Sequence, residues 1–202
     1  MKRFEKILTH LLTAGIVAGM ALNFSACSKE SPVSAESSNA GKTIQTNKGP
    51  VRLLQLASDA STLHKGSAED TLFYKEQFMP AIKRGTIRLG NVYYGHSKIT
   101  FFRKSILEDM TIQFQWLASS TFEGLLNNLE FGPHGATFNV PVRVRLSYKR
   151  ADLSGIDETA LQVYFFNEDT GLWELIGGEV DTENKVVIVY LEHFSRYALA
   201  AN

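Results

Sequence analysis

From Gly85 onward, apolar and polar residues alternate along short segments, and this alternation constrains the fold more than any other feature of the sequence. Met110–Trp116 reads Met-Thr-Ile-Gln-Phe-Gln-Trp, and Val140–Tyr148 repeats the pattern. Successive side chains of a strand point to opposite faces, so a period of two predicts strands with one buried face. Shorter segments of the same kind are Thr86–Leu89, Ile99–Phe101, Leu161–Phe166, Leu172–Ile176, Val186–Leu191 and Tyr197–Leu199.

Turn-forming residues separate these segments. Gly132–Gly135, Asn167–Gly171, Gly177-Gly178 and Asp181–Asn184 are rich in glycine, asparagine and aspartate, which favour tight turns. Phe122–Leu129 could form one or two helical turns, but no longer stretch has a strong helical period. Many short strands joined by turns predict an all-β protein, specifically an antiparallel β-sandwich.

Several motifs, taken in order, resemble one known domain. Gly85–Ile87, Leu107–Ile112, Phe131–Phe138 and His193–Ala198 are similar to successive signatures of the ZU-five β-sandwich domain found in ankyrins, netrin receptors and zonula occludens proteins. The resemblance covers about residues 84–202 and implies a ZU-five-like sandwich. It does not imply one function, because the domain serves as an interaction and scaffolding module in many settings.

The N-terminus has the pattern of an export signal. Lys2, Arg3 and Lys6 precede a mostly apolar stretch, Ile7–Leu22, that is too short and too interrupted for a transmembrane span of about 20 apolar residues. A positive start, a short apolar middle and small residues at the end are typical of a secretory signal peptide, predicted here as residues 1–26.

Cys27 is the single cysteine of the chain and follows that signal directly. Phe24-Ser25-Ala26-Cys27 resembles a bacterial lipobox, which implies cleavage before Cys27 and attachment of acyl chains such as palmitate. Several acyl chains give stable anchoring where one is marginal. By the same resemblance, Ser28 after the cysteine permits export to the outer membrane, facing the periplasm or the exterior. The alternative is an ordinary cleaved signal that leaves a free thiol.

Two segments separate the cysteine from the predicted sandwich. Residues 27–50 are rich in serine and lack aromatic residues, leucine and methionine, so they predict a flexible tether. Residues 51–83 mix apolar and polar groups, and Pro80 disfavours a helix through its position. We expect this lead-in segment to dock on the main domain, residues 84–202, rather than fold alone.

Charge and motif content exclude several classes of protein. Lys plus Arg and Asp plus Glu both number 21, and a neutral chain lacks the excess positive charge that a dedicated nucleic-acid binder needs. One cysteine excludes an intramolecular disulfide. The sequence has no phosphate loop, cofactor fingerprint or Ser-His-Asp order, so we expect neither a cofactor nor a turnover enzyme.

The tripeptide His193-Phe194-Ser195 carries the one candidate reaction. In some ZU-five relatives the same tripeptide cleaves itself between Phe and Ser, with serine as nucleophile and histidine as general base. The resemblance therefore keeps open an autoproteolytic domain. The structural alternative places Phe194 in the core and bonds His193 and Ser195 locally.

The histidines and acidic loops do not predict a metal site. His64, His96, His134 and His193 lack the spacing of metal ligands, and His10 leaves with the signal. His134 is expected to be a solvated turn residue. Asn167–Gly171 faintly resembles a calcium loop, but a hairpin turn explains its composition.

Two groups are candidates for surface contacts. Arg143 and Arg145 lie two residues apart and share a strand face, next to Lys149 and Arg150, so they could contact an anionic lipid or an acidic glycan. The alternative is a solvated outer face. Tyr93-Tyr94 could stack on a carbohydrate or a peptide, or simply pack at a strand end.

These features together predict a membrane-anchored, exported bacterial lipoprotein that acts as a non-enzymatic binding or structural module at the cell envelope. Its expected partners are the lipid bilayer, through Cys27, and an envelope protein or glycan. The alternatives are self-cleavage at Phe194 and an accessory domain that binds envelope polysaccharide.

Overall fold

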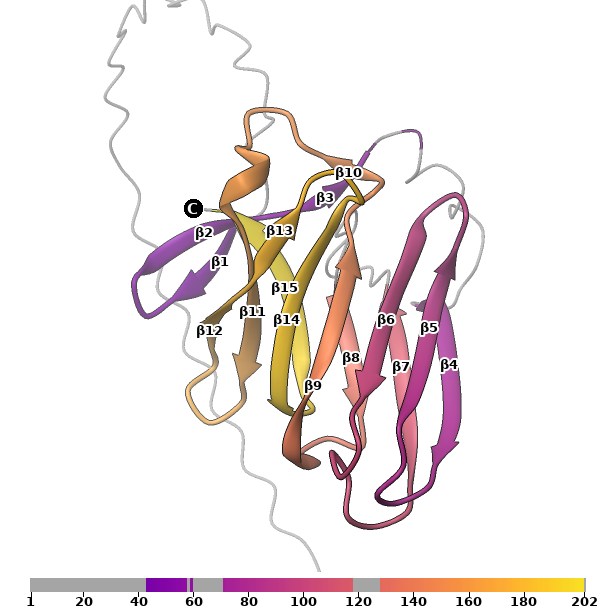
Figure 1. The fold of residues 1–202 in the computed structure, drawn as a ribbon. Helices are drawn as coiled ribbons and strands as arrows, with labels where there is room; N and C mark the ends of the chain where they lie inside the picture. Colours follow the sequence, from indigo (N-terminus) through magenta and orange to yellow (C-terminus); the bar gives the residue numbers. More distant parts are fainter. Residues whose placement is uncertain (1–42, 58, 60–70, 118–127, 202) are drawn as a thin grey trace, which may run out of the picture. The chain divides into compact units, whose positions relative to one another are not determined.

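The computed structural model describes residues 43–57, 59, 71–117 and 128–201, which belong to one compact unit spanning residues 39–202. Most of these residues are in strands, joined by turns and one short 3-10 helix, η3 (Glu158–Ala160). Two large sheets pack face to face, and the prediction of an all-β sandwich is confirmed (Figure 1). Within the described residues, no helix is long and apolar enough to cross a membrane.

The larger sheet has eight strands in the order β11-β12-β1-β2-β15-β8-β7-β4. All neighbouring strands in it are antiparallel except β1 and β12. The strands of this sheet are β1 (Thr43–Thr46), β2 (Gly49–Leu53), β4 (Thr71–Met79), β7 (Met110–Leu117), β8 (Asn128–Gly132), β11 (Leu161–Asn167), β12 (Leu172–Gly177) and β15 (Arg196–Ala201).

The smaller sheet has five antiparallel strands in the order β13-β14-β9-β6-β5. A further short pair joins β3 (Gln55–Leu56) to β10 (Ala151–Asp152). The strands of the smaller sheet are β5 (Gly85–Asn91), β6 (Gly95–Phe101), β9 (Thr137–Ser147), β13 (Glu179–Asp181) and β14 (Val186–His193).

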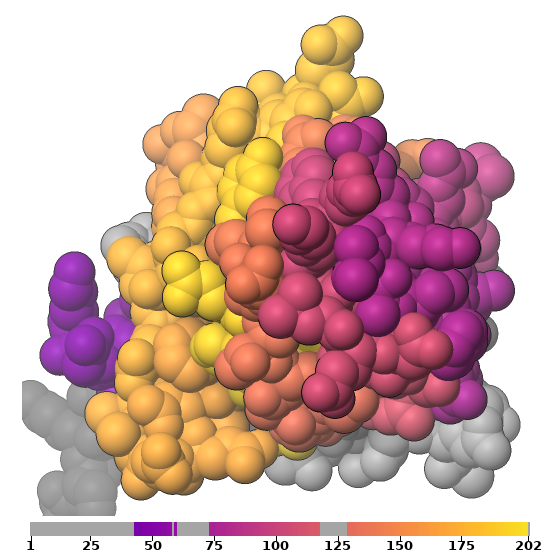
Figure 2. All heavy atoms as spheres, turned by 60° about the horizontal axis from the view of Figure 1, so that its bottom comes forward, coloured from indigo at the N-terminus to yellow at the C-terminus, as the bar shows by residue number. Residues whose placement is uncertain are grey.

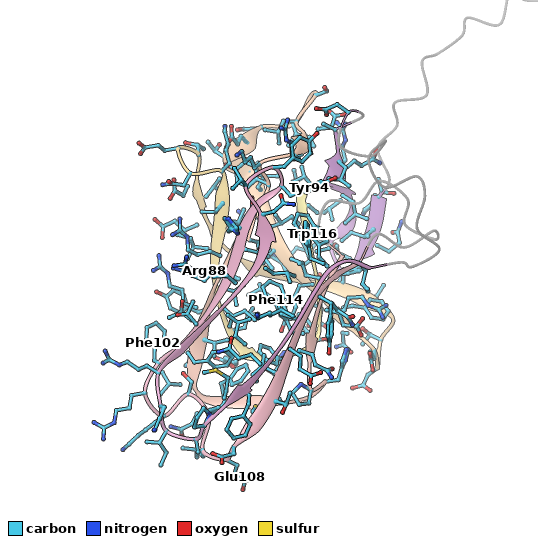
Figure 3. The ribbon with its side chains drawn as sticks, turned by 90° about the vertical axis from the view of Figure 1, so that its right-hand side faces the viewer. Arg88, Tyr94, Phe102, Glu108, Phe114 and Trp116 are labelled. Carbon is cyan, nitrogen blue, oxygen red and sulfur yellow. The ribbon has the colours of Figure 1, made fainter. Side chains whose placement is uncertain are left out.

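The alternation of the sequence places the core between the sheets. On β7, Phe114 and Trp116 are fully buried, and on the facing sheet Ile87 and Ile99 are equally buried. Figure 3 shows Phe114 and Trp116 pointing into the space between the two sheets. Burying a large apolar side chain contributes about 2–3 kcal/mol, so these positions hold the sheets together.

A second core lies inside a ring of strands. Because β11 pairs with both β12 and β15, the five strands β11, β12, β1, β2 and β15 close on themselves. Ile44, Val51 and Leu53 from β1 and β2 pack there with Trp173 of β12. The ring therefore joins the first described strand to the last strand of the chain.

This ring corrects two predicted boundaries. The tether was expected to extend to residue 50, yet β1 and β2 are paired from Thr43 onward. The sandwich was expected to begin at residue 84, yet β1, β2 and β4 are integral strands of the larger sheet. The polar composition of residues 43–50 concealed this, because one buried side chain, Ile44, is enough to seat a four-residue strand against Trp173. Residues 28–42 lie outside the described residues.

The predicted strand segments fall within strands except at Tyr148, which lies one residue beyond β9, and two further differences occur. β9 begins at Thr137, earlier than Val140, and Pro141 lies where the register between β9 and β14 shifts. A proline has no amide to donate, so a position beside a register shift accommodates it. Asn128–Gly132 is a strand, so the interpretation of Phe122–Leu129 as a helical turn is wrong at its C-terminal end. Residues 122–127 lie outside the described residues.

Candidate functional site

The outer side of the smaller sheet carries a row of three positive charges. Arg88 on β5 pairs with Lys98 on β6, and Lys98 pairs with Arg145 on β9. All three point away from the core because their chain neighbours Ile87, Ile99 and Val144 point into it. Figure 3 shows Arg88 pointing outward on this side of the sandwich. Like charges directly opposite each other destabilise a sheet, so the row is unfavourable for folding alone.

A fourth cation, Arg143, lies beside this row. Arg143 is two residues from Arg145 on β9 and therefore lies on the same face, as the sequence predicts. It pairs with Thr100 of β6 on one side and with Tyr190 of β14 on the other. The Tyr190 side chain is 56% exposed. We call Arg88, Lys98, Arg143 and Arg145 the cationic face.

The charges of the cationic face are poorly neutralised. Arg145 has one partner, a Nη2 to Oδ2 distance of 3.8 Å to Asp181. Among the described residues, no carboxylate forms an ion pair with Arg88, Lys98 or Arg143. Burial, and then the charges of Arg145, Arg88 and Arg143, lowers the pKa of Lys98. The face therefore carries a positive potential although the whole chain has no net charge.

Two buried donors on this face lack an acceptor. The Nε atoms of Arg143 and Arg145 are buried, and within the described part of the chain neither has a hydrogen-bond partner. Buried polar atoms are almost always satisfied by protein, water or ligand. Because these two Nε atoms are themselves buried, an anion would meet the outer parts of the guanidinium groups and not the Nε atoms.

A hollow of about 250 Å³ lies at one end of the cationic face. Buried Ser147 lies on its wall, and Lys149 is held at its rim because its Nζ donates to the Val92 carbonyl at 2.7 Å. Gly95 borders the same hollow with a φ of 83°, and a Cβ there would collide with the Ser147 hydroxyl. The lining residues are Arg88, Gly95, His96, Lys98, Arg145, Ser147, Lys149, Asn184 and Val186.

Of the two alternatives for Tyr93-Tyr94, the structure favours packing at a strand end over an exposed stacking surface. Tyr94 is 3% exposed and packs edge-on against Phe73 and Trp116 in the core. The Tyr93 ring is covered by the Arg150 guanidinium, whose carbon lies 3.8 Å from the ring centroid. The Asn91 side chain is the physical reason. Its oxygen accepts from the amides of both tyrosines at 2.9 Å and so forms the turn that directs Tyr94 inward.

Phe194 of the candidate self-cleavage motif is a core residue. It is 1% exposed, stacks on Phe131 with centroids 5.4 Å apart, and meets Phe138 edge-on at 4.7 Å. Its amide donates to the Ala136 carbonyl at 2.8 Å. Both ends of the residue are thus fixed by the turn that precedes β9.

The other two members of the motif are not arranged as nucleophile and base. The Ser195 hydroxyl donates to the Phe166 carbonyl at 3.2 Å, and the His193 ring lies edge-on to Phe165. Among the described residues, no hydrogen bond joins the His193 ring to Ser195. The Phe194 carbonyl does accept one amide, from Gly135 at 3.1 Å. One donor on the carbonyl polarises it, but the hydroxyl still needs a base within hydrogen-bond reach.

The remaining candidates have ordinary surroundings. His134 lies in its turn with Nε2 2.7 Å from Glu130, and Asn167 organises its hairpin by accepting from the Asp169 amide at 2.9 Å. Among the residues that the structure describes, no group of three or more His, Cys, Asp or Glu side chains could hold a metal ion. Cys27 and His64 lie outside the described residues.

The comparisons with known proteins do not assign a family to this chain. The architecture defines a β-sandwich domain, and no family model matches the sequence. The chain is 31% identical over 83 residues to an amylopullulanase from Thermoanaerobacterium thermosulfurigenes. That match covers 39% of this chain and 4% of the length of the amylopullulanase.

Proposed function

We propose that the protein is a non-enzymatic binding module of the bacterial cell envelope, and that its ligand is an anionic polysaccharide bound on the cationic face. The observation that carries the proposal is the row of Arg88, Lys98 and Arg145, which repel one another across three strands. An arrangement that is unfavourable for folding and lacks counter-charges is favourable for receiving a polyanion.

The spacing of the row supports a polymer rather than a single small anion. Adjacent strands lie about 4.8 Å apart, so the three cations span roughly 10 Å across the sheet. Carboxylates or phosphates repeated along a glycan chain can contact such a row in succession. Tyr190, exposed beside Arg143, offers an aromatic ring on which a sugar can stack.

The partial match to an amylopullulanase bears on the polysaccharide class alone. The name of that enzyme refers to pullulan, a neutral glycan, so the preference for an anionic glycan comes from the cationic face and not from the match. The match is too short to transfer activity to this chain. The sequence motifs favour a non-enzymatic role. The signal motif supports attachment through acylated Cys27, preferentially to the outer membrane, which would hold the domain among envelope polymers.

Binding to polygalacturonate, a polyanionic glycan, tests the proposal against pullulan, a neutral one. The full chain should bind polygalacturonate, and binding should weaken as salt increases. The double variant Arg88→Glu/Lys98→Glu should reduce affinity at least about tenfold, since it reverses two of the contacting charges. Lys48→Glu, which reverses one charge in the exposed β1–β2 turn and is matched to the single variant Lys98→Glu, should leave affinity unchanged. The proposal is refuted if the full chain does not bind polygalacturonate, or if Lys48→Glu lowers the affinity as much as Arg88→Glu/Lys98→Glu does.

The anchor has its own test. Mass spectrometry of the protein from its native membrane should show residues 1–26 removed and acyl chains on Cys27. Cys27→Ser should abolish acylation. An unacylated thiol in the native protein would instead support an ordinary cleaved signal.

A further inference from the structure

Two connections at one end of the sandwich are fastened to each other. Residues 80–84 join β4 to β5, and residues 102–109 join β6 to β7; both lie at the lower end in Figure 1. The Ile82 amide donates to the Ile106 carbonyl at 2.9 Å, and the Lys104 amide donates to the Ile82 carbonyl at 3.3 Å. The Ala81 amide donates to Asp109 Oδ1 at 2.7 Å. We call these two connections the lower tip; Figure 2 turns it toward the viewer.

The lower tip presents two aliphatic side chains to solvent. Ile82 is 47% exposed and Leu107 is 58% exposed, one on each connection. Ile82 has a φ of 66°, a left-handed conformation in which a β-branched residue is an outlier. Glycine would satisfy this turn without strain and without exposing apolar surface. An exposed isoleucine in this position therefore does not serve the fold.

Basic residues lie on the same two connections as these side chains. Four exposed basic residues belong to the same connections, and among the described residues none of them forms an ion pair. The carboxylates of the tip are Glu108 and Asp109, and Asp109 is already occupied by the Ala81 amide. Figure 3 shows Glu108 at the lower extreme of the molecule. The four cations are Lys83, Arg84, Arg103 and Lys104.

We propose that the lower tip docks on a bilayer that contains anionic lipid, with Ile82 and Leu107 entering the boundary between headgroups and acyl chains. Exposed aliphatic side chains ringed by Lys and Arg are the combination that interfacial lipid binding requires. The cations contact lipid phosphates while the two aliphatic side chains leave water. The docking uses none of the cationic face, so it is independent of the glycan ligand.

The docking is weak by itself and gains from tethering. Two aliphatic side chains and a net excess of two cations support only reversible attachment. A chain already held near the membrane has a high effective concentration of its tip at the surface. The consequence of docking is therefore a fixed orientation of the domain, rather than attachment as such.

Two tryptophan probes, one at the lower tip and one at the opposite end of β5, test the orientation of the domain on the bilayer. Leu107→Trp reports from the lower tip, and Val92→Trp reports from the far end of β5, where Val92 is 80% exposed. Both are made in the full chain and mixed with vesicles of phosphatidylglycerol and phosphatidylcholine that carry brominated acyl chains. The tip probe should be quenched and the Val92 probe should not. Equal quenching of the two probes, or no quenching of either, overturns the proposal.

Charge variants separate lipid docking from glycan binding. Arg103→Glu/Lys104→Glu should lower the apparent affinity for vesicles, measured by quenching of the tip probe, by about tenfold or more. The same variant should leave polygalacturonate binding intact. Arg88→Glu/Lys98→Glu should do the reverse. Vesicles of phosphatidylcholine alone should give little quenching. If Arg103→Glu/Lys104→Glu instead abolishes a dimer that sedimentation detects without vesicles, the tip is an interface between two copies of the chain and the lipid proposal is wrong.

Discussion

Lys98 and Arg145 lie directly opposite each other on β6 and β9, cation against cation, on the solvent side of the smaller sheet. Arg88 completes the row on the other side of Lys98. The middle cation therefore faces repulsion from both neighbours, which makes it the residue at which stability and binding are most directly opposed.

Lys98→Glu should stabilise the domain while weakening polyanion binding. The change converts two repulsive cross-strand pairs into attractive ones, and each such pair is worth roughly 0.2–1 kcal/mol. Urea unfolding at low salt should show a gain of about 1 kcal/mol that shrinks at high salt. Lys48→Glu is the matched control and should change stability little. A loss of stability in Lys98→Glu would mean that the row is not repulsive.

Gly95→Ala should destabilise the domain more than Gly135→Ala does. Both glycines have positive φ, 83° and 74°, so alanine is strained at either position by about 1 kcal/mol. A Cβ at Gly95 also meets the Ser147 hydroxyl, whereas a Cβ at Gly135 meets nothing within 4 Å. Denaturant unfolding should therefore give a loss of about 2 kcal/mol or more for Gly95→Ala and about 1 kcal/mol for Gly135→Ala. Equal losses would contradict the close approach of Gly95 to Ser147.

Ile82→Gly should stabilise the domain by about 1 kcal/mol. It removes the strain of a β-branched residue at a φ of 66°, which outweighs the extra entropy of glycine in the unfolded chain. Val92→Gly, at a more exposed turn position without a positive φ, should not stabilise. Chemical unfolding of both variants checks the difference. An Ile82→Gly variant less stable than wild type would show that the Ile82 side chain contributes to packing.

Glu158 should contribute to stability at neutral pH and lose that contribution in acid. The ammonium of Lys185, 2.7 Å away, and then the Tyr148 hydroxyl hold the pKa of Glu158 below its ordinary value of 4.5. A carboxyl with a lowered folded-state pKa stabilises above its unfolded pKa, and the effect is lost as pH falls through the folded pKa. Glu158→Gln should therefore lower the unfolding free energy by up to about 1 kcal/mol at pH 7, with the pair partly exposed to solvent. The deficit should shrink below pH 4.5, and a deficit that does not vary with pH would count against the ion pair.

The Phe194–Ser195 bond should remain intact. The Ser195 hydroxyl donates to the Phe166 carbonyl, an arrangement that directs its proton away from His193. Intact mass of the purified protein, incubated over days, should show a single uncut chain. A fragment beginning at Ser195, abolished by Ser195→Ala, would restore the autoproteolytic alternative.

The strands after residue 85 were predictable because alternation is a property of each segment by itself. Ile112, Phe114 and Trp116 reveal their shared face without any partner strand. β1 was not predictable in this way, since Ile44 is the single buried residue of a four-residue strand and its partner Trp173 lies far along the sequence.

The candidate site likewise depends on contacts between distant strands that one segment alone does not reveal. Arg143 and Arg145 could be placed on one face from their spacing alone, whereas Arg88 and Lys98 join them only through the register of β5, β6 and β9. The inward direction of Tyr94 could not be predicted for a local reason. The Asn91 side chain forms the turn that directs Tyr94 into the core, and an aromatic pair in a turn does not reveal its direction from sequence.

The closed ring of β1, β2, β12, β11 and β15 determines how the domain would carry a mechanical load. Tension applied to the chain before Thr43 enters at β1, whose neighbours on both sides are hydrogen-bonded strands. The pull is then shared with β2 and, through β2, with the C-terminal strand β15. Because the ring has no free edge at this point, detachment cannot start by peeling an outer strand. A domain tethered by its N-terminal segment would therefore resist traction with the strands that also enclose its second core.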